Sequence, residues 1–597
     1  RSAAAAGQIL RTRVSAMGIA FFDARDGRGA EPVPNGDTVS PVAGPDDAKG
    51  GLRRAAMLQA LAAAVWVPQA ALLAVSVDRI ADGGGLYDVL WPALGILLLG
   101  FARSCLDAAG GRLAFQAARA ELSRRRQIAT AALSMSSPVD RSRPASGKAA
   151  SVIGEQAELI VPYLARFQPA RMKASLVPLI ILAFILPVSW IAALVLLFAA
   201  PLIPIFMALI GWRAQAASER QLVATGGLNG FLLDRLRGLA TIRALDAVDA
   251  TALRLRSEAE SLRTRTMAVL KIAFLSSAVL ELFAALGVAM IAVYVGFSLL
   301  GEIRFGTWVG RLDLTEGLFI LLLAPAFFEP LRELSAVWHD RAAGEAALKA
   351  LDTLAAGGLS IRGAADVAPA VSAVAEAPPI RIENVDFRYA AAEPLILDGF
   401  NLDIAACEHL ALLGASGSGK STLLSLISGL APCTGGRIVI GGIELADDSA
   451  HALRASMAWI GQRPHIFAGT IAGNIALGRP GILRGNLMDA LDAARLGKVA
   501  AAYGNRPLGE GGIGLSGGEA LRLAIARAAC NPHLRIILAD EPTAHLDAAT
   551  AAEVTESLLS LARGRTLIVA THDPRLAARM HRAMCVDAGI VIREAAE

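Results

Sequence analysis

Long stretches without a charged residue dominate the first half of this 597-residue chain. Residues 55–77, 190–212 and 282–301 each run for 20 residues or more without Asp, Glu, Lys or Arg. An α-helix needs about 20 apolar residues to cross the roughly 30 Å of hydrocarbon in a bilayer. The first half of the chain is therefore predicted to be an all-α membrane domain.

Three shorter apolar runs, at 89–102, 174–187 and 317–328, complete the set. Runs of this length can span where protein rather than lipid surrounds their polar ends, so we expect six transmembrane helices. Hydrophobic residues make up 54% of the chain and charged residues 18%. Such a composition excludes an ordinary soluble enzyme, and the length calls for more than one domain.

Basic residues are distributed unevenly between the connections. Segments 112–173 and 213–268, which we interpret as polar continuations of the helices, carry eleven and nine Lys/Arg, whereas the opposite loops carry only Arg79, Arg304 and Arg311. The positive-inside rule places the basic segments in the cytosol. Six spans then return the C-terminal half to the cytosol as well.

The remaining segments set the predicted domain boundaries. Residues 1–52 are rich in Gly, Pro, Ala, Asp and Arg and are expected to be a disordered tail. The membrane domain is predicted at 53–345, a linker at 346–379 and a second domain at 380–597. The five cysteines have no metal-site spacing and are interpreted as reduced thiols.

The second domain contains a phosphate-binding pattern, Gly414-Ala-Ser-Gly-Ser-Gly-Lys420-Ser421. It lies between an apolar strand at 408–413 and a helix at 421–427, which is the context that a P-loop requires. Lys420 would reach the β- and γ-phosphates and Ser421 would ligate Mg²⁺. A second apolar strand ends in Asp540, suited to the Mg²⁺ shell, and Glu541, suited to act as general base.

Together with Leu515-Ser-Gly-Gly-Glu519, these motifs make residues 380–597 resemble the α/β nucleotide-binding domain of ABC transporters. The resemblance implies ATP and Mg²⁺ as ligands, and a signature sequence that serves ATP bound to a partner chain. It implies the catalytic residues Glu541, His572 and Gln462 and the metal ligands Ser421, Gln462 and Asp540. It implies the nucleotide-binding residues Tyr389, Gly414, Ala415, Ser416, Gly417, Ser418, Gly419, Lys420, Ser421, Thr422, Ser516, Gly517, Gly518 and Asp547.

Two further stretches, 467–475 and 509–511, resemble exporters rather than importers, which implies a type I exporter membrane domain. Glu519 and Leu521 stand where that family usually has glutamine, and the segment between 475 and 509 is shorter than usual. No γ-phosphate contact is removed by these departures. Hydrolysis is therefore still expected, although the two shared ATP sites need not be equivalent.

Residues 155–169, 201–207, 231–243 and 327–334 resemble the D subunit of the bacterial CydDC exporters, and the resemblance extends over 53–597. It implies a heterodimer with a CydC-like half-transporter in the cytoplasmic membrane. It also implies ATP-driven export of cysteine or glutathione that supports cytochrome bd assembly. Haem transport, a homodimeric lipid or drug flippase and a regulatory subunit with weak ATPase activity remain alternatives, and no nucleic-acid partner is expected.

Several polar residues of the membrane half are left open. Glu281 and Glu329 either form an interhelical ion pair or hydrogen bond, or line a substrate path, because an ionised carboxylate is costly in a membrane. His339 is interpreted as a helix-surface residue rather than a haem ligand. The turns near 137–143 and 232–243 are expected to press on the ATPase domains.

Overall fold

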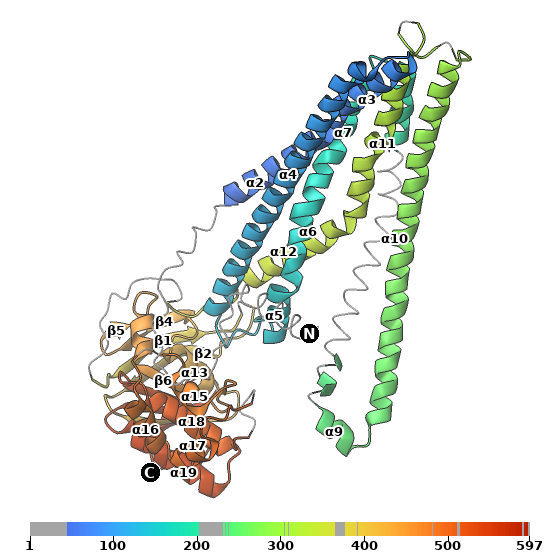
Figure 1. Ribbon diagram of the computed structural model, residues 1–597. Coiled ribbons are helices and arrows are strands. Elements are labelled where there is room, and N and C mark those ends of the chain that lie inside the picture. Colours follow the sequence, from blue (N-terminus) through green and yellow to red (C-terminus); the bar gives the residue numbers. More distant parts are fainter. Residues whose placement is uncertain are drawn as a thin grey trace. The chain divides into compact units, whose positions relative to one another are not determined.

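The computed structural model describes residues 45–594 apart from 202–230, 233, 237, 304, 309, 364–375, 391, 480, 510–513 and 588–589. Most of the predicted tail, the greater part of the expected fourth span, and residues 510 and 511 of the exporter-like stretch lie outside the described residues. The described chain is helical as far as Ala355 and becomes an α/β domain from Ile380 onward (Figure 1).

Five helical stretches among the described residues are long and apolar enough to cross a membrane. They correspond to the first, second, third, fifth and sixth predicted spans. A shorter apolar helix, Trp190–Pro201, begins where the fourth span was expected and leads into the undescribed segment. The five stretches are Lys49–Ala81, Leu86–Met135, Ser146–Ile185, Glu281–Leu299 and Leu314–Ala355.

The first span is formed by α2 (Pro45–Ala64) and α3 (Trp66–Ala81). Because α2 begins at Pro45, the last residues of the segment 1–52 are helical rather than disordered. The local sequence accounts for this start. Proline is favoured at the first helical position, and Asp46 and Asp47 lie near the positive end of the helix dipole.

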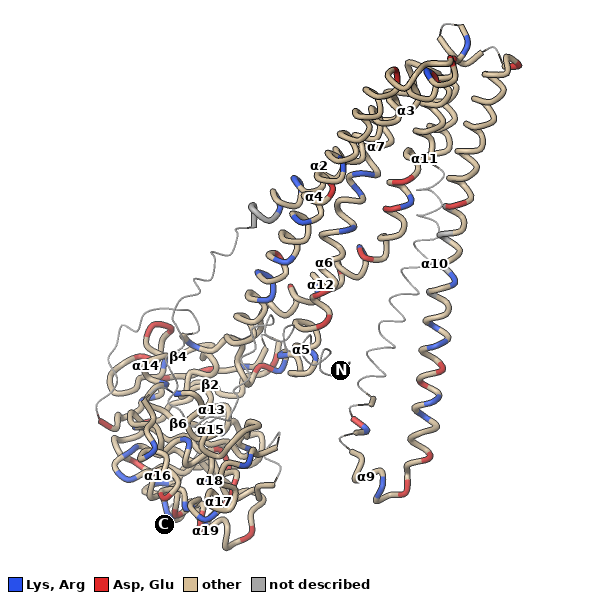
Figure 2. The backbone as a smooth tube through the Cα atoms, viewed as in Figure 1, with Lys and Arg blue, Asp and Glu red and all other residues tan. Residues whose placement is uncertain are grey.

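Helices α4 (Leu86–Met135) and α10 (Val248–Leu299) are 50 and 52 residues long. Each consists of an apolar part and a segment rich in charge. Figure 2 shows this for α10, whose charged residues gather toward α9 (Leu239–Ala244). Residues 112–135 of α4 and 248–268 of α10 are therefore continuations of membrane helices, as predicted for these parts of the basic segments. The apolar part of α10 matches the fifth predicted span.

The third span continues a chain of short helices, in which Tyr163–Phe167 forms a π-helix. Gly344, in the helix Trp338–Ala355, packs against Tyr163. A Cβ on Gly344 would lie only 2.2 Å from the Cβ of Tyr163, so this close approach requires glycine. The elements are α5 (Ser146–Gly154), η1 (Gln156–Leu159), α6 (Ile160–Pro162), η2 (Tyr163–Phe167) and α7 (Gln168–Ile185).

The sixth span, α11 (Leu314–Ala336), is followed by α12 (Trp338–Ala355). Helix α12 continues past the boundary predicted at residue 345, so the first part of the expected linker is helical. Its Ala- and Leu-rich sequence favours a helix. It buries Ala347, Leu351 and Leu354, spaced to lie on one helical face.

The core of the membrane domain lies around α11, which packs against α3, α7 and α10. Phe327 and Phe328 are among the largest fully buried side chains. Gly287 of α10 faces Phe328, and a Cβ on Gly287 would lie 2.4 Å from the end of that ring. Glycine at this position therefore allows α10 and α11 to pack closely.

The α/β domain contains two sheets. One has the order β2-β1-β4-β5 and is antiparallel; the other has the order β10-β9-β3-β8-β7-β6 and is parallel except for β10. The strands are β1 (Ile380–Phe387), β2 (Leu397–Ile404), β3 (His409–Leu413), β4 (Gly435–Ile440), β5 (Ile443–Glu444), β6 (Met457–Ile460), β7 (Ile536–Asp540), β8 (Thr566–Ala570), β9 (Arg582–Asp587) and β10 (Ile590–Glu594).

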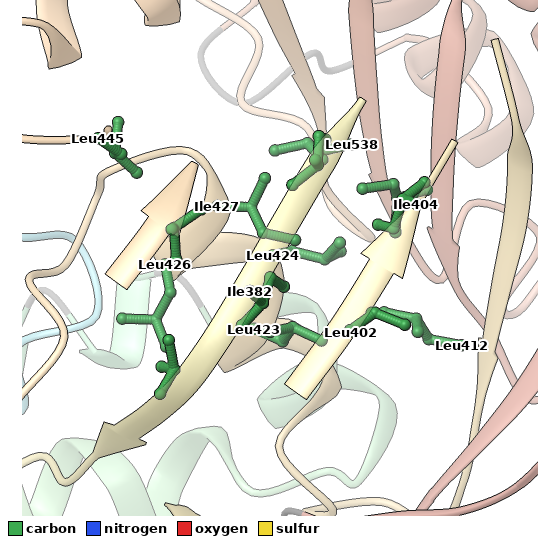
Figure 3. Packing of buried hydrophobic residues seen from close by; sticks show 14 of the residues in the cluster. Ile382, Leu402, Ile404, Leu412, Leu423, Leu424, Leu426, Ile427, Leu445 and Leu538 are labelled. Atoms are coloured by element: carbon green, nitrogen blue, oxygen red, sulfur yellow. The ribbon is translucent and has the colours of Figure 1, made fainter. Parts of the chain in front are cut away.

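Leucine and isoleucine side chains from both sheets meet on α13 (Lys420–Ile427). Figure 3 shows Leu423 and Leu424 of this helix beside Ile382, Leu402 and Leu538, which are all buried. This packing fixes the helix that begins at the phosphate loop. The other helices are α14 (Ala450–Ala455), α15 (Ile471–Ala476), α16 (Arg484–Ala493), α17 (Gly497–Tyr503), α18 (Gly517–Ala529), α19 (Ala548–Ala562) and α20 (Pro574–Ala577).

Candidate functional site

The carboxyl ends of the parallel strands β3, β6, β7 and β8 lie at one edge of the sheet. The phosphate loop follows β3, Gln462 follows β6, Asp540 ends β7, and His572 follows β8. Ligands of open α/β sheets bind at this edge. Tertiary structure thus gathers the motifs that are separated in the sequence.

The phosphate loop has a backbone that only glycine adopts readily. Gly414, Gly417 and Gly419 have φ values of 149°, 86° and 98°. A Cβ on Gly414 would lie 2.2 Å from the carbonyl oxygen of Val586. The remaining loop residues are Ala415, Ser416 and Ser418, and Lys420, Ser421 and Thr422 form the first turn of α13.

Lys420 is buried and its ammonium group turns back onto the loop. Its Nζ donates hydrogen bonds of 2.8 Å to the carbonyl oxygens of Gly414 and Ala415. A buried ammonium group needs such partners. Phosphate oxygens of a nucleotide would offer this charge a stronger acceptor.

The hydroxyl of Ser421 donates a hydrogen bond of 2.9 Å to Asp540 Oδ1. Hard oxygen ligands of this kind are the ones that Mg²⁺ prefers, so the pair fits the predicted metal role. Burial raises the pKa of Asp540 above its ordinary value. The neighbouring carboxylate of Glu541 also raises it, while the Ser421 hydrogen bond and the charge of Lys420 lower it.

Glu541 lies between the other two predicted catalytic residues. Its Oε2 accepts a hydrogen bond of 3.1 Å from Gln462 Nε2, and its Oε1 lies 3.4 Å from His572 Nδ1. The backbone N–H of Glu541 donates to the carbonyl of Ala570 at 2.8 Å, with φ at 46°. The carboxylate is therefore held from two sides at the end of β7.

His545 is a neighbour of this cluster for which no role was predicted. Its Nε2 lies 3.5 Å from Gln462 Nε2, and its φ of 63° is left-handed. Its position four residues after Glu541, the predicted general base, was the signal that could have found it. Only the fold shows that the turn brings it back toward Gln462.

Tyr389 follows β1 and lies against the phosphate-loop helix. Its hydroxyl and Thr422 Oγ1 are 2.7 Å apart, and its ring meets Phe387 edge-on at a centroid distance of 5.1 Å. The guanidinium of Arg141, from the turn at 137–143, lies 4.3 Å from the ring centroid. The turn was predicted to contact an ATPase domain, but the contact between Arg141 and Tyr389 was not predicted.

The signature residues are held apart from this cluster. Ser516 caps α18, and its hydroxyl and backbone N–H both donate to Glu519 Oε2, at 2.9 Å and 2.7 Å. Ser516 and Gly517 are exposed, while Gly518 is buried against Thr550. The glutamate that departs from the family pattern thus completes a capping box.

Asp547 caps the next helix, α19. Its Oδ1 accepts from the backbone N–H groups of Ala549 and Thr550, and its Oδ2 accepts from the Thr550 hydroxyl at 2.6 Å. Hydrogen bonds from Thr550 lower the pKa of this carboxyl. The recorded contacts of Ser516 and Asp547 are thus made within α18 and α19, and none reaches the phosphate loop of the described chain.

The membrane helices carry a second polar cluster. Arg332 of α11 bonds Glu281 of α10 at 3.0 Å and Glu329 at 2.5 Å. This is the interhelical ion pair that was one of the two readings of these carboxylates. All three side chains are nevertheless 40–68% exposed. His339 is exposed beside Asp340, as expected of a helix-surface histidine.

The turns at 137–143 and 232–243 differ in what they contact within the described chain. In the first, the hydroxyl of Ser137 donates a hydrogen bond to the carbonyl of Leu430 in the ATPase domain. The second contains α9, which packs against α10. Leu236, Leu239 and Leu245 around α9 are exposed.

Two family descriptions cover both halves of the chain. That of the ABC transporter matches residues 397–544, and that of the ABC transporter transmembrane region matches residues 55–319. The chain therefore belongs to the ABC transporter family. It is an exporter half-transporter with one membrane domain and one domain that couples ATP hydrolysis to transport.

Individual relatives narrow the comparison. The glutathione/L-cysteine transport system ATP-binding/permease protein CydD of Escherichia coli (strain K12) is 39% identical over 434 residues, 72% of each chain. The corresponding CydC protein of Bacillus subtilis (strain 168) is 29% identical over 539 residues, 89% of this chain and 90% of its own.

The fold also has a solved counterpart. A bacterial Atm1-family ABC exporter with ATP bound has a TM-score of 0.68 at 24% identity, covering 91% of this chain and 95% of its own. This likeness confirms the type I exporter fold.

Proposed function

We propose that this chain is the CydD-like half of a heterodimer that exports cysteine or glutathione from the bacterial cytosol and supports cytochrome bd assembly. The identity to a CydD protein over most of the chain supports this cargo. The likeness to a CydC protein supports a partner of that kind. The ATPase domain would lie on the cytosolic side of the cytoplasmic membrane.

The observation that carries the proposal is the division of the nucleotide site. Lys420, Ser421, Asp540 and Glu541 lie together, while Ser516 is exposed on another helix. A nucleotide bound on the phosphate loop would therefore be completed by a signature sequence from a second chain. Two such chains facing each other would enclose two ATP molecules.

Hydrolysis would start from the held carboxylate of Glu541, which accepts the proton of the attacking water. Gln462 and His572 orient this carboxylate and the water. Mg²⁺ would be held by Ser421, Asp540 and Gln462, and when bound it neutralises charge on the phosphates. Lys420 would release its two carbonyl contacts to bind the β- and γ-phosphates.

Transport requires that ATP and cargo each prefer one of two conformations, because a ligand with equal affinity for both shifts nothing. Closure of the ATPase domains would be transmitted through the cytosolic turns to the long helices. Hydrolysis would then reset the pair. This is an alternating-access cycle.

The Glu281–Arg332–Glu329 cluster is a candidate lining of the cargo path. Its charges are solvent-accessible in the isolated chain, and lipid cannot solvate them. A water-filled path or the partner chain must therefore face them. An amino acid or short peptide carries both an ammonium group for the glutamates and a carboxylate for Arg332.

Transport by inside-out membrane vesicles tests the proposal. Vesicles with this chain and a CydC-like partner should accumulate labelled cysteine or glutathione in the presence of ATP, and vesicles with either chain alone should not. Accumulation of haem but not of cysteine or glutathione would show that haem is the cargo. Lipid or drug movement by this chain alone would instead establish a homodimeric flippase.

A further inference from the structure

The turn at 137–143 is anchored in the ATPase domain at Leu430 and in the linker before it at Leu359. Ser137 is fully buried, and its backbone N–H donates to the carbonyl of Leu359 at 2.8 Å. Val139 packs against the hydrophobic core that contains α13. Asp140 accepts a hydrogen bond of 3.1 Å from the backbone N–H of Leu359. The next residue, Arg141, therefore extends from a fixed base.

Arg141 has two partners in the ATPase domain. Its guanidinium lies over the ring of Tyr389, 4.3 Å from the centroid, and its Nη1 is 3.1 Å from Glu393 Oε2. A guanidinium is attracted to the face of an aromatic ring. The carboxylate of Glu393 helps to hold the group in that place.

The ring of Tyr389 is itself restrained. The Thr422 contact holds its hydroxyl, and Phe387 packs edge-on against it. Adenine stacked on this ring would lie roughly 3.5–4 Å from the face, the usual contact distance between carbon atoms. The Arg141 guanidinium occupies this space on one face of the ring. Adenine that stacked on the same face would have to displace it.

We propose that Arg141 is a latch that covers the adenine-stacking face of Tyr389 until ATP displaces it. The inference rests on the proposed ATP-driven function, in which Tyr389, one of the nucleotide-binding residues implied by the family resemblance, would stack on adenine. Since the turn follows α4 directly after Met135, displacement would report nucleotide binding to a membrane helix. Only molecules with the latch open bind ATP on this face, so the apparent dissociation constant equals the intrinsic one divided by the open fraction.

Equilibrium binding of ATP to the full heterodimer in lipid nanodiscs tests the latch. Glu541→Gln in the background prevents turnover. Arg141→Ala should tighten ATP binding roughly two- to fivefold, the factor expected from loss of an exposed cation–π contact. Arg143→Ala removes the same charge from the same turn and is the matched control. Its affinity should stay unchanged or weaken slightly.

Glu393→Gln should also tighten ATP binding, and should add little once Arg141 is alanine, because both changes open the same latch. Unchanged or weaker binding in Arg141→Ala would overturn the proposal. Weaker binding would mean that the guanidinium supports the bound nucleotide instead of excluding it.

Tyr389→Ala separates the latch from its premise. It should weaken ATP binding and remove the effect of Arg141→Ala. If Tyr389→Ala leaves the affinity unchanged, both the adenine assignment and the latch are overturned. If it weakens binding while Arg141→Ala tightens nothing, only the latch is overturned and the adenine assignment stands.

Discussion

Gln462 Nε2 donates a hydrogen bond of 3.1 Å to Glu541 Oε2, so a residue two positions after β6 holds the carboxylate that follows β7. These strands are neighbours in the parallel sheet. The carboxylate of Glu541, the proposed general base, is therefore oriented by a residue that follows the neighbouring strand.

Replacing Glu541 by glutamine should lower the rate of ATP hydrolysis in the heterodimer by about 10²–10⁴-fold, the contribution of a general base. ATP binding should remain, because the phosphate loop is unchanged. Steady-state phosphate release and equilibrium ATP binding measure the two effects. Unaltered export by this variant would show that catalysis in this chain is dispensable.

Glu519 should stabilise the start of α18. Glu519→Ala removes the acceptor of both Ser516 hydrogen bonds and should cost about 0.5–1 kcal/mol. Glu519→Gln keeps an acceptor and should cost less. The melting temperature of the ATPase domain is the measurement. Equal melting temperatures for wild type and Glu519→Ala would show that the capping box adds nothing.

His409 should make the ATPase domain less stable in mild acid. Burial lowers the pKa of His409 below its ordinary value of 6.5, and the charge of the stacked ring of His581 lowers it further. The unfolded chain then binds a proton more readily than the folded one. This contribution to stability is complete above pH 6.5 and is lost as the pH falls through the window below it.

Melting temperatures measured between pH 8 and pH 5 test this pH dependence. The decrease on acidification should be smaller in His409→Gln than in wild type. His533 is an exposed histidine of the same domain, so His533→Gln is the control and should behave like wild type. A pH profile identical in His409→Gln and wild type would exclude the effect.

Arg332→Ala should impair cargo coupling without affecting nucleotide binding. Loss of a charge-assisted hydrogen bond commonly costs about 1.5–3 kcal/mol, so the thiol concentration for half-maximal ATPase stimulation should rise roughly tenfold or more. Arg119→Ala removes the exposed Arg119–Glu158 ion pair and should have little effect. Equal responses of the two variants would argue against a cargo role for Arg332.

Local sequence patterns predicted those elements whose own residues favour the conformation that the segment adopts in the fold. The apolar strand expected at 408–413 is β3, and the helix expected at 421–427 is α13, each within one residue of the predicted bounds. The phosphate loop and the acidic end of β7 were predictable because their chemistry demands particular residues at fixed spacing. The chain order of Gln462 and His572 relative to these motifs followed from the family resemblance.

Other features depend on tertiary contacts that no local pattern records. Arg141 was one basic residue among eleven in its segment until the fold placed it over Tyr389. Glu519 was a departure from the family pattern until its contacts with Ser516 showed a capping role. Helix α12 ran past the expected boundary because Ala347 and Leu351 are buried against other elements.

The length of α10 has a mechanical consequence. Its apolar part, Glu281–Leu299, is preceded in the same helix by residues 248–280. At 1.5 Å per residue, these residues extend about 50 Å. The helix contains no proline, so it lacks the commonest cause of a kink. As a stiff lever pivoting at the bilayer, it would convert a tilt of about 5° into a sweep of about 4 Å at α9.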